Sequence, residues 1–283
     1  MDQKLRERLR AVRHVALDMD GTIYLGSTLF PYTLPFLNKL GRLGITYSFL
    51  TNNPSKSLNA YLDRLRNFGV PCTREQMYST TAATIDYIRV HYPDAKRLFL
   101  LGTPSMISQF ETAGFVSCAD SPEDVPDVVV AAFDMTLEYS RLCRCCWWAS
   151  QKKEDGSYSI PFVATNPDWV CPTDQQTILV DCGSICACIA AATGRKPDLV
   201  IGKPNPDILY GVLHSKGLTP GEAAMVGDRL YTDVQTALNA GALGVLVLSG
   251  ETTAEVAATA DPDVLVCRDI EEFGNLLEEA RKY

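Results

Sequence analysis

The chain lacks any long apolar run, and it has no excess of basic charge. No stretch approaches the roughly 18 consecutive apolar residues that a membrane-spanning helix needs. The first ten residues are rich in charge and contain no apolar segment of the kind found in signal peptides. The net charge of -8 disfavours nucleic-acid binding, which depends on a basic surface. We therefore expect a cytoplasmic protein that binds neither nucleic acid nor membrane.

Metal-binding patterns built on histidine and cysteine are also missing. The chain has only 3 histidines, and its 10 cysteines do not form the two C-x-x-C pairs of a zinc site. Reduced cysteines usually pack as small apolar side chains, which is our expectation here. A thiol-based or metal-based regulatory role stays an open alternative for the two groups of closely spaced cysteines, Cys143/Cys145/Cys146 and Cys182/Cys186/Cys188.

Short apolar segments alternate with amphipathic stretches along nearly the whole chain. Several segments are continuous runs of Val, Ile and Leu, which is typical of strands buried on both faces of a parallel sheet. This alternation predicts an α/β fold with right-handed crossovers. The expected strands are 14–17, 46–50, 97–101, 128–133, 160–164, 199–201, 223–226, 244–248 and 264–267. The expected helices are 55–68, 104–113, 136–153, 207–216, 230–240 and 270–282.

The first expected strand runs directly into two carboxylates, Asp18 and Asp20, which Gly21 and Thr22 follow. Ligands of open α/β sheets bind beyond the carboxyl ends of strands, so both carboxylates are expected at such a site. A carboxylate can attack a phosphate ester when Mg²⁺, which prefers oxygen ligands, neutralises charge. The second carboxylate can protonate the leaving oxygen and later activate water. A surface turn rich in Asp and Gly is the alternative interpretation of this segment taken alone.

Three further strand ends carry groups that a phosphate site needs. Thr51 follows a strand and offers its hydroxyl beside backbone N–H groups that can bind an anion. Lys203 can hold phosphate and keep a nearby carboxylate ionised, and its setting excludes a P-loop. Asp228 and Asp233 follow another strand and can complete a magnesium shell. Helix capping or a preference for acidic residues at helix starts could explain single motifs, but four such strand ends together favour a catalytic site.

The segments DMDGTIYLG, LTNN, GKPNP and GDRLYTDV resemble, in this order, the four motifs of the haloacid dehalogenase superfamily. More narrowly, they resemble its NagD-like, 4-nitrophenyl phosphatase-type branch. The resemblance implies a Mg²⁺-dependent phosphatase with Asp18 as nucleophile, a phospho-aspartyl intermediate and Asp20 as general acid and base. It further implies Mg²⁺ ligands from Asp18, Asp228 and the backbone carbonyl of Asp20 with support from Asp233, and phosphoryl contacts from Thr51, Asn52 and Lys203.

The middle of the chain has few candidate catalytic groups, whereas both flanks have many. With the resemblance, this predicts a Rossmann-like parallel-sheet core from residues 1–79 and 195–283, and an inserted α/β cap at 80–194 that excludes water and sets specificity. Within the cap, the loop after strand 160–164 offers hydroxyl, amide, carboxylate and indole groups. The expected specificity residues are Thr165, Asn166, Asp168 and Trp169. A simple turn, with the indole packed against the cap, is the alternative.

The expected partner is a small phosphorylated metabolite, such as a sugar phosphate, a phosphoglycolate-like acid or a nucleotide. Catalytic motifs fix the reaction but not the leaving group, so the sequence does not choose among these. Residues 180–184 also depart from the Pro-Gly-x-Gly stretch that is frequent in the branch. A phosphotransferase that uses the same intermediate and a catalytically silent binding protein are the alternatives, and a homodimer through the cap is left open.

Overall fold

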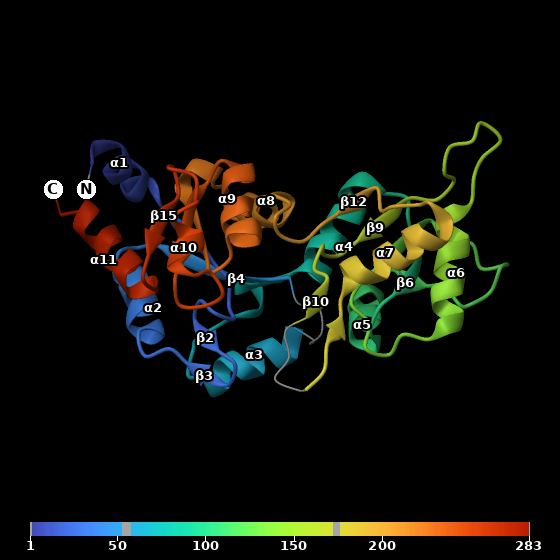
Figure 1. The fold of residues 1–283 in the computed structure, drawn as a ribbon, viewed down its shortest axis with the longest axis horizontal. Coiled ribbons are helices and arrows are strands. Elements are labelled where there is room, and N and C mark those ends of the chain that lie inside the picture. The colour runs from blue at the N-terminus through green and yellow to red at the C-terminus, as the bar shows by residue number, and fades with distance from the viewer. Residues whose placement is uncertain (1, 53–57, 172–175, 283) are drawn as a thin grey trace. The chain divides into compact units, whose positions relative to one another are not determined.

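A computed structural model of the chain describes residues 2–52, 58–171 and 176–282 (Figure 1). Its residues group into two compact units, one formed by 1–51, 60–78 and 203–283, the other by 52–59 and 79–202. Residues 195–202, expected in the core, group with the second unit because β12 (Leu199–Val200) pairs with β9 (Phe162–Ala164). None of the helices in the described ranges has the length and apolarity needed to cross a membrane.

The first unit is built on a six-stranded sheet in the order β15-β14-β13-β1-β4-β5. Strand β1 lies in its interior, with Leu17 opposite Val226 on one side and Phe49 on the other. The strands are β1 (His14–Leu17), β4 (Thr46–Thr51), β5 (Met77–Ser79), β13 (Ala223–Gly227), β14 (Leu243–Val247) and β15 (Leu265–Cys267). β1 pairs in parallel with β13 and β4, and β13, β14 and β15 are also parallel, so the carboxyl ends of these five strands lie along one edge of the sheet.

Helices flank this sheet, and both ends of the chain lie together beside it (Figure 1). α2 contacts α11, and α1 contacts α11. The other elements are α1 (Gln3–Ala11), β2 (Tyr24–Leu25), β3 (Thr28–Leu29), α2 (Thr33–Arg42), α3 (Leu58–Asn67), η1 (Arg74–Gln76), α8 (Asp207–His214), η2 (Pro220–Glu222), η3 (Leu230–Val234), α9 (Gln235–Ala240), α10 (Ala254–Ala257) and α11 (Ile270–Ala280).

The second unit has its own five-stranded sheet, in the order β12-β9-β8-β6-β7, and each neighbouring pair is parallel. Its strands besides β9 and β12 are β6 (Arg97–Leu101), β7 (Val116–Ser117) and β8 (Val128–Ala131), and β10 (Val170–Cys171) pairs with β11 (Leu179–Val180) in a separate ribbon. The helices are α4 (Thr80–His91), α5 (Pro104–Thr112), α6 (Tyr139–Ser150) and α7 (Cys182–Thr193). Two parallel sheets with helical crossovers confirm the predicted α/β fold with an α/β insertion.

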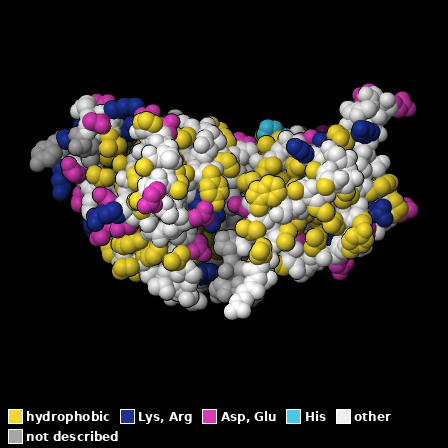
Figure 2. Space-filling model, in the orientation of Figure 1, with side chains coloured by type: hydrophobic (Ala, Val, Ile, Leu, Met, Phe, Trp, Pro, Cys, Tyr) yellow, Lys and Arg dark blue, Asp and Glu magenta, His cyan; other side chains and the backbone are white. Residues whose placement is uncertain are grey.

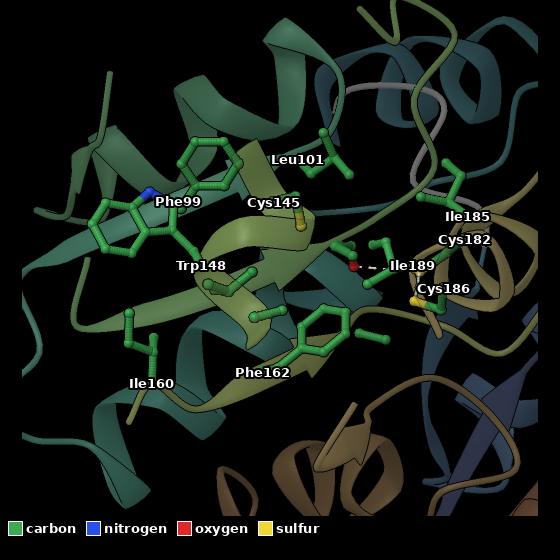
Figure 3. Packing of buried hydrophobic residues seen from close by; sticks show 14 of the residues in the cluster. Phe99, Leu101, Cys145, Trp148, Ile160, Phe162, Cys182, Ile185, Cys186 and Ile189 are labelled. Carbon is green, nitrogen blue, oxygen red and sulfur yellow. Dashed lines mark hydrogen bonds between the residues drawn. The ribbon is translucent and has the colours of Figure 1, made fainter. Parts of the chain in front are cut away.

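Apolar side chains from β6, β8, β9, α6 and α7 form the core of the second unit (Figure 3). Phe99 and Phe162 from two strands and Trp148 from α6 are its large members, and all three are buried. Cys145, Cys182 and Cys186 fill space among them, as expected for reduced cysteines. Hydrophobic side chains of this unit also appear on the face shown in Figure 2. Trp147 is 41% exposed.

Local sequence signals begin several of these helices. Thr103 accepts a hydrogen bond from the Met106 backbone N–H at 3.3 Å and precedes Pro104 at the first helical position of α5. Asp181 begins α7 by accepting from the Cys182 N–H at 2.6 Å, and Asp269 caps α11 through the Glu272 N–H at 2.9 Å. Short polar side chains therefore define where these three helices begin.

Candidate active site

Asp18 stands at the carboxyl end of β1, in the interior of the first sheet. Its backbone N–H donates to the Val226 carbonyl at 2.8 Å, which continues the pairing with β13 by one residue. Because β13 ends one residue later at Gly227, Asp228 emerges at the same edge. The two carboxylates therefore reach one place from strands that are more than 200 residues apart in the sequence.

A third carboxylate comes from the helical segment that follows β13. Asp233 lies in η3, a single π-helical turn, and is fully buried. Its carboxylate accepts from the Arg229 backbone N–H at 3.1 Å, which holds the side chain against the start of the turn. Single π-helical turns are frequent at functional sites. Ligand atoms of Asp18, Asp228 and Asp233 all lie within 4.8 Å of one another, a group that could hold a metal ion.

Lys203 is buried among these carboxylates. Its Nζ lies 2.5 Å from Asp18 Oδ1 and 2.6 Å from Asp233 Oδ1. Burial alone would lower the pKa of this ammonium group, but the two carboxylates outweigh it and raise the pKa, so Lys203 stays charged. Lys203 therefore pairs with two of the three carboxylates, and the Arg229 guanidinium acts as a further positive charge on Asp228.

Burial is the main influence on the pKa values of two of these carboxylates. Burial raises the pKa of Asp18 to about 8, with further increases from Asp233 and Asp228 and an opposing effect of Lys203. Burial and Asp233 together raise the pKa of Asp228 to about 6. Asp228 Oδ1 is also buried without a hydrogen-bond partner among the described residues. A cation bound here would supply the missing partner and lower both pKa values.

A loop after β14 also contributes to the site, although none of the expected site residues lies in it. The Glu251 backbone N–H donates to Asp228 Oδ2 at 2.6 Å, and the Ser249 hydroxyl donates to the Gly21 carbonyl at 2.7 Å. Gly250 and Gly21 both approach the Asp228 carboxylate so closely that a Cβ atom would lie 2.6 Å and 2.7 Å from its Cγ. The signal was present, because Ser249-Gly250-Glu251 is another strand end with small polar residues.

The remaining core residues occupy neighbouring positions. Asp20 is exposed two residues beyond Asp18, with its Oδ1 3.5 Å from the Gly26 backbone nitrogen. Thr51 is buried at the end of β4, the strand next to β1. Asn52 groups with the second unit, where its side-chain amide donates to Asp168 Oδ2 at 3.0 Å. The structure thus brings together Asp18, Lys203, Asp228 and Asp233, with Thr51 on the adjoining strand.

The four expected specificity residues differ in their exposure. Thr165 and Asn166 are fully buried, and Asp168 is partly buried. Trp169, in contrast, is 64% exposed. Within this segment, Trp169 therefore has the most surface to offer a ligand and Asp168 has some, whereas Thr165 and Asn166 have none.

The clustered cysteines do not assemble into a metal site. Cys145, Cys182 and Cys186 are buried in the core of the second unit, and the Cys182 and Cys186 sulfur atoms lie 4.0 Å apart. Cys143 and Cys188 are exposed. Across residues 2–52, 58–171 and 176–282, the group with metal-binding spacing is the aspartate cluster of the first unit, and no group of three includes a cysteine. The packing role expected for the buried cysteines agrees with this arrangement.

Comparison with known proteins identifies the family. A model described as haloacid dehalogenase-like hydrolase matches residues 15–116, and a second, HAD-hydrolase-like model matches residues 200–273. The chain is 31% identical to an acid sugar phosphatase of Staphylococcus aureus over 239 residues, which cover 84% of this chain and 87% of the relative. The chain belongs to the haloacid dehalogenase-like hydrolases.

Solved structures place this hydrolase in the expected branch of the family. A 4-nitrophenylphosphatase from Thermotoga maritima has a TM-score of 0.85 and 38% identity, covering 95% of this chain and 98% of that one. A glycerol phosphate phosphatase from Mycobacterium tuberculosis, solved in complex with calcium, has a TM-score of 0.80 and 25% identity, covering 94% and 75%. The predicted resemblance to 4-nitrophenyl phosphatase-type enzymes is therefore confirmed.

Proposed function

We propose that this phosphoric monoester hydrolase cleaves small phosphomonoesters with the help of Mg²⁺ through a phospho-Asp18 intermediate. The observation that carries the proposal is the buried group of Asp18, Asp228 and Asp233 around the Lys203 ammonium. A carboxylate nucleophile, a set of oxygen ligands and a fixed positive charge are the components that phosphoryl transfer to a carboxylate requires.

The donor set fits a hard divalent cation. Carboxylate and carbonyl oxygens suit Mg²⁺, and the unpartnered Oδ1 of Asp228 points to a missing ligand. We propose that Asp18, Asp228 and the Asp20 backbone carbonyl hold Mg²⁺, with Asp233 beside them. The calcium complex of the mycobacterial relative is consistent with a divalent cation. When bound, Mg²⁺ would neutralise charge on the phosphoryl oxygens.

The side chains of the first unit and Asn52 then carry out two chemical steps. An Asp18 carboxylate oxygen forms a bond to phosphorus while the bond from phosphorus to the ester oxygen breaks, and Asp20 protonates that leaving oxygen. In the second step Asp20 takes a proton from water as the water attacks phosphorus, and the bond to Asp18 breaks to release phosphate. Lys203, Thr51 and Asn52 hold the phosphoryl group through both steps.

The second unit is proposed to act as the cap that sets substrate choice. Its segment Thr165–Trp169 follows β9, and Trp169 offers an exposed indole to the leaving group of the substrate. The relatives act, by their names, on different small phosphates, so a small phosphorylated metabolite is the proposed substrate class. We further propose a cytoplasmic enzyme that does not use nucleic acid or membrane, and a homodimer through the cap stays a prediction.

The testing experiment measures phosphate release from a panel of small phosphate esters, with Mg²⁺ and with a chelator. Turnover should require the metal, and Asp18→Asn should reduce kcat by about a thousandfold or more, because the amide cannot act as the nucleophile. Asp63→Asn is the matched control, since Asp63 lies exposed on α3 and pairs with Arg66. Near-normal turnover by the Asp18→Asn enzyme, or full activity after chelation, would rule out this mechanism.

A further inference from the structure

A hydrogen-bonded group in the second unit joins Asn52, Asn166 and Asp168, and we call it the amide clasp. The Asn52 side-chain amide donates to Asp168 Oδ2 at 3.0 Å, and the Asn166 amide donates to the same oxygen at 2.9 Å. One carboxylate oxygen therefore accepts two amide donors from segments more than 110 residues apart. Hydrogen bonds to an ionised acceptor are stronger than those between neutral groups.

Further hydrogen bonds hold the Asn166 side chain of the clasp in place. Asn166 is fully buried, and its side-chain oxygen Oδ1 accepts a hydrogen bond from the Thr165 hydroxyl at 2.8 Å. Its amide also donates to Asp181 Oδ1 at 3.0 Å, and Asp181 caps the start of α7. Because the amide of Asn166 has partners on both its oxygen and its nitrogen, the orientation of this side chain is determined by its surroundings. Asp168 is therefore held by a rigid part of the second unit.

The clasp lies beside two points where the chain passes between the units. Asn52 directly follows Thr51 of β4, and its backbone carbonyl lies 3.5 Å from the Thr80 hydroxyl of α4. Gly202 directly precedes Lys203, and its backbone N–H donates to the Thr165 carbonyl at 2.9 Å. The segment Thr165–Asp168 thus forms hydrogen bonds with Asn52, which follows Thr51, and with Gly202, which precedes Lys203.

We propose that Asp168 is a positioning residue that acts through Asn52 on phosphate binding, an inference that rests on the proposed function. By fixing the Asn52 side chain, the clasp orients the backbone on which Thr51 and Asn52 meet the phosphoryl group. Small displacements of such groups carry large costs in rate. Asp168 acts on the phosphoryl group that all substrates share, whereas leaving-group contacts belong to Trp169.

The test compares Asp168→Asn, Asn52→Ala and the double variant with the unaltered enzyme. Inorganic phosphate is the probe, and its inhibition constant is measured with Mg²⁺ present. Asp168→Asn should weaken phosphate inhibition roughly tenfold, and by less than about twofold when Asn52 is already alanine, because the two residues act in series. The loss in kcat/KM should be the same factor for every substrate of the panel.

A matched control is Asp127→Asn. Asp127 also accepts two donors, the Lys96 and Arg97 backbone N–H groups at 2.8 Å each, but at the opposite, amino ends of strands in the same sheet. This variant should leave phosphate inhibition unchanged. Equal phosphate inhibition in the Asp168→Asn and unaltered enzymes would overturn the proposal, as would full additivity with Asn52→Ala.

Hydrogen exchange gives a readout that does not depend on catalysis. Peptides covering 46–52 should exchange faster in Asp168→Asn, and also in Asn52→Ala, which serves if the first variant does not fold. Unchanged exchange of these peptides in both variants would overturn the positioning role proposed for the clasp. If the unaltered protein neither binds phosphate nor cleaves esters, the proposed function fails and the assigned effect of Asp168 fails with it. If the unaltered protein binds phosphate normally and Asp168→Asn has no effect on that binding, only the positioning role of Asp168 is overturned.

Discussion

Burial lowers the pKa of two basic side chains of the first unit, but their neighbours give the two groups opposite net shifts. Lys203 lies between Asp18 and Asp233, and these carboxylates keep it protonated although burial opposes the charge. His14 is fully buried on β1, with ring nitrogens 2.8 Å from the Thr46 hydroxyl and 2.9 Å from the Ser48 hydroxyl. Burial, with a smaller effect of Lys216, lowers its pKa to about 3. A cation is thus maintained only where carboxylates surround it.

His14 should make the fold sensitive to acid. Its pKa falls from an ordinary 6.5 to about 3 on folding, so its contribution to stability is complete above pH 6.5 and is lost as the pH falls toward 3. Between pH 6.5 and 4.5 this loss amounts to roughly 2–3 kcal/mol. Glutamine does not titrate, so the free energy of unfolding of His14→Gln, measured by urea unfolding, should fall correspondingly less over that pH range. Parallel losses in both proteins would contradict the prediction.

At this scale the sequence predicted much of the site, since the strand ends carry recognisable residue types. Asp18, Lys203 and Asp228 were expected at strand ends and Asp233 near the start of the next helix, and the structure brings their side chains together. The double ion pair of Lys203 was not predictable, because it depends on side-chain packing across the sheet. The roles of these residues in catalysis stay predictions for the experiments described above.

Elements joined to strand ends help to position the aspartate cluster. The loop after β14 supplies one backbone N–H to Asp228 and a hydroxyl to the Gly21 carbonyl. Gly250 lies in this loop, and any side chain at this position would overlap the Asp228 carboxylate. The loop therefore sets the position of Asp228 through close backbone approach, for which glycine is required.

Gly250→Ala should displace Asp228 while leaving the sheet intact. A displacement of this size should reduce kcat/KM by about a hundredfold, and Mg²⁺ affinity should fall with it. Titration calorimetry with Mg²⁺ and phosphate-release kinetics would measure the two effects. Gly221→Ala is the matched control, because a Cβ atom there would meet nothing within 4 Å. Unaltered metal binding in Gly250→Ala would show that the loop does not position Asp228.

The strands of the two parallel sheets were predicted except for the edge strands β5 and β7, whereas α1, α2, α4, α7 and α10 were not among the expected helices. Each expected strand has a counterpart, because buried parallel strands are continuous apolar runs. α7 was missed since its sequence, CGSICACIAAAT, is small and apolar on most sides and lacks an amphipathic stripe. The expected helix 230–240 divides into a π-helical turn, which contains the buried Asp233, and α9. The expected helix 55–68 begins outside the described residues, which include α3 from Leu58.

At the scale of the whole molecule, the proposed function divides chemistry and substrate choice between the two units. The aspartate cluster belongs to the first unit, and Trp169 belongs to the second. Such a division lets one reaction serve different substrates by changes in the inserted unit alone. Sequence marked this insertion by its shortage of catalytic groups, but the position of its second boundary depended on the pairing of β12, which is a matter of tertiary structure.

Trp169→Ala should therefore alter substrate preference without altering phosphate binding. The kcat/KM values for about five chemically distinct phosphates should change by unequal factors that differ at least about tenfold, because specificity is a ratio of such values. Inhibition by inorganic phosphate should stay constant. Trp147→Ala, which removes another exposed indole of the same unit, is the control. A uniform loss across the panel would assign Trp169 a structural role only.

The strand order of the first sheet has a consequence for how the chain acquires its structure during synthesis. β1 is among the first elements made, yet its partner β13 begins at Ala223, so one edge of β1 has no strand beside it until most of the chain exists. Closing so long a loop is costly in entropy and slow. The second unit, with its own sheet, can complete its pairings within that interval. An open strand edge invites aggregation, so the nascent chain is most vulnerable before the last 60 or so residues emerge.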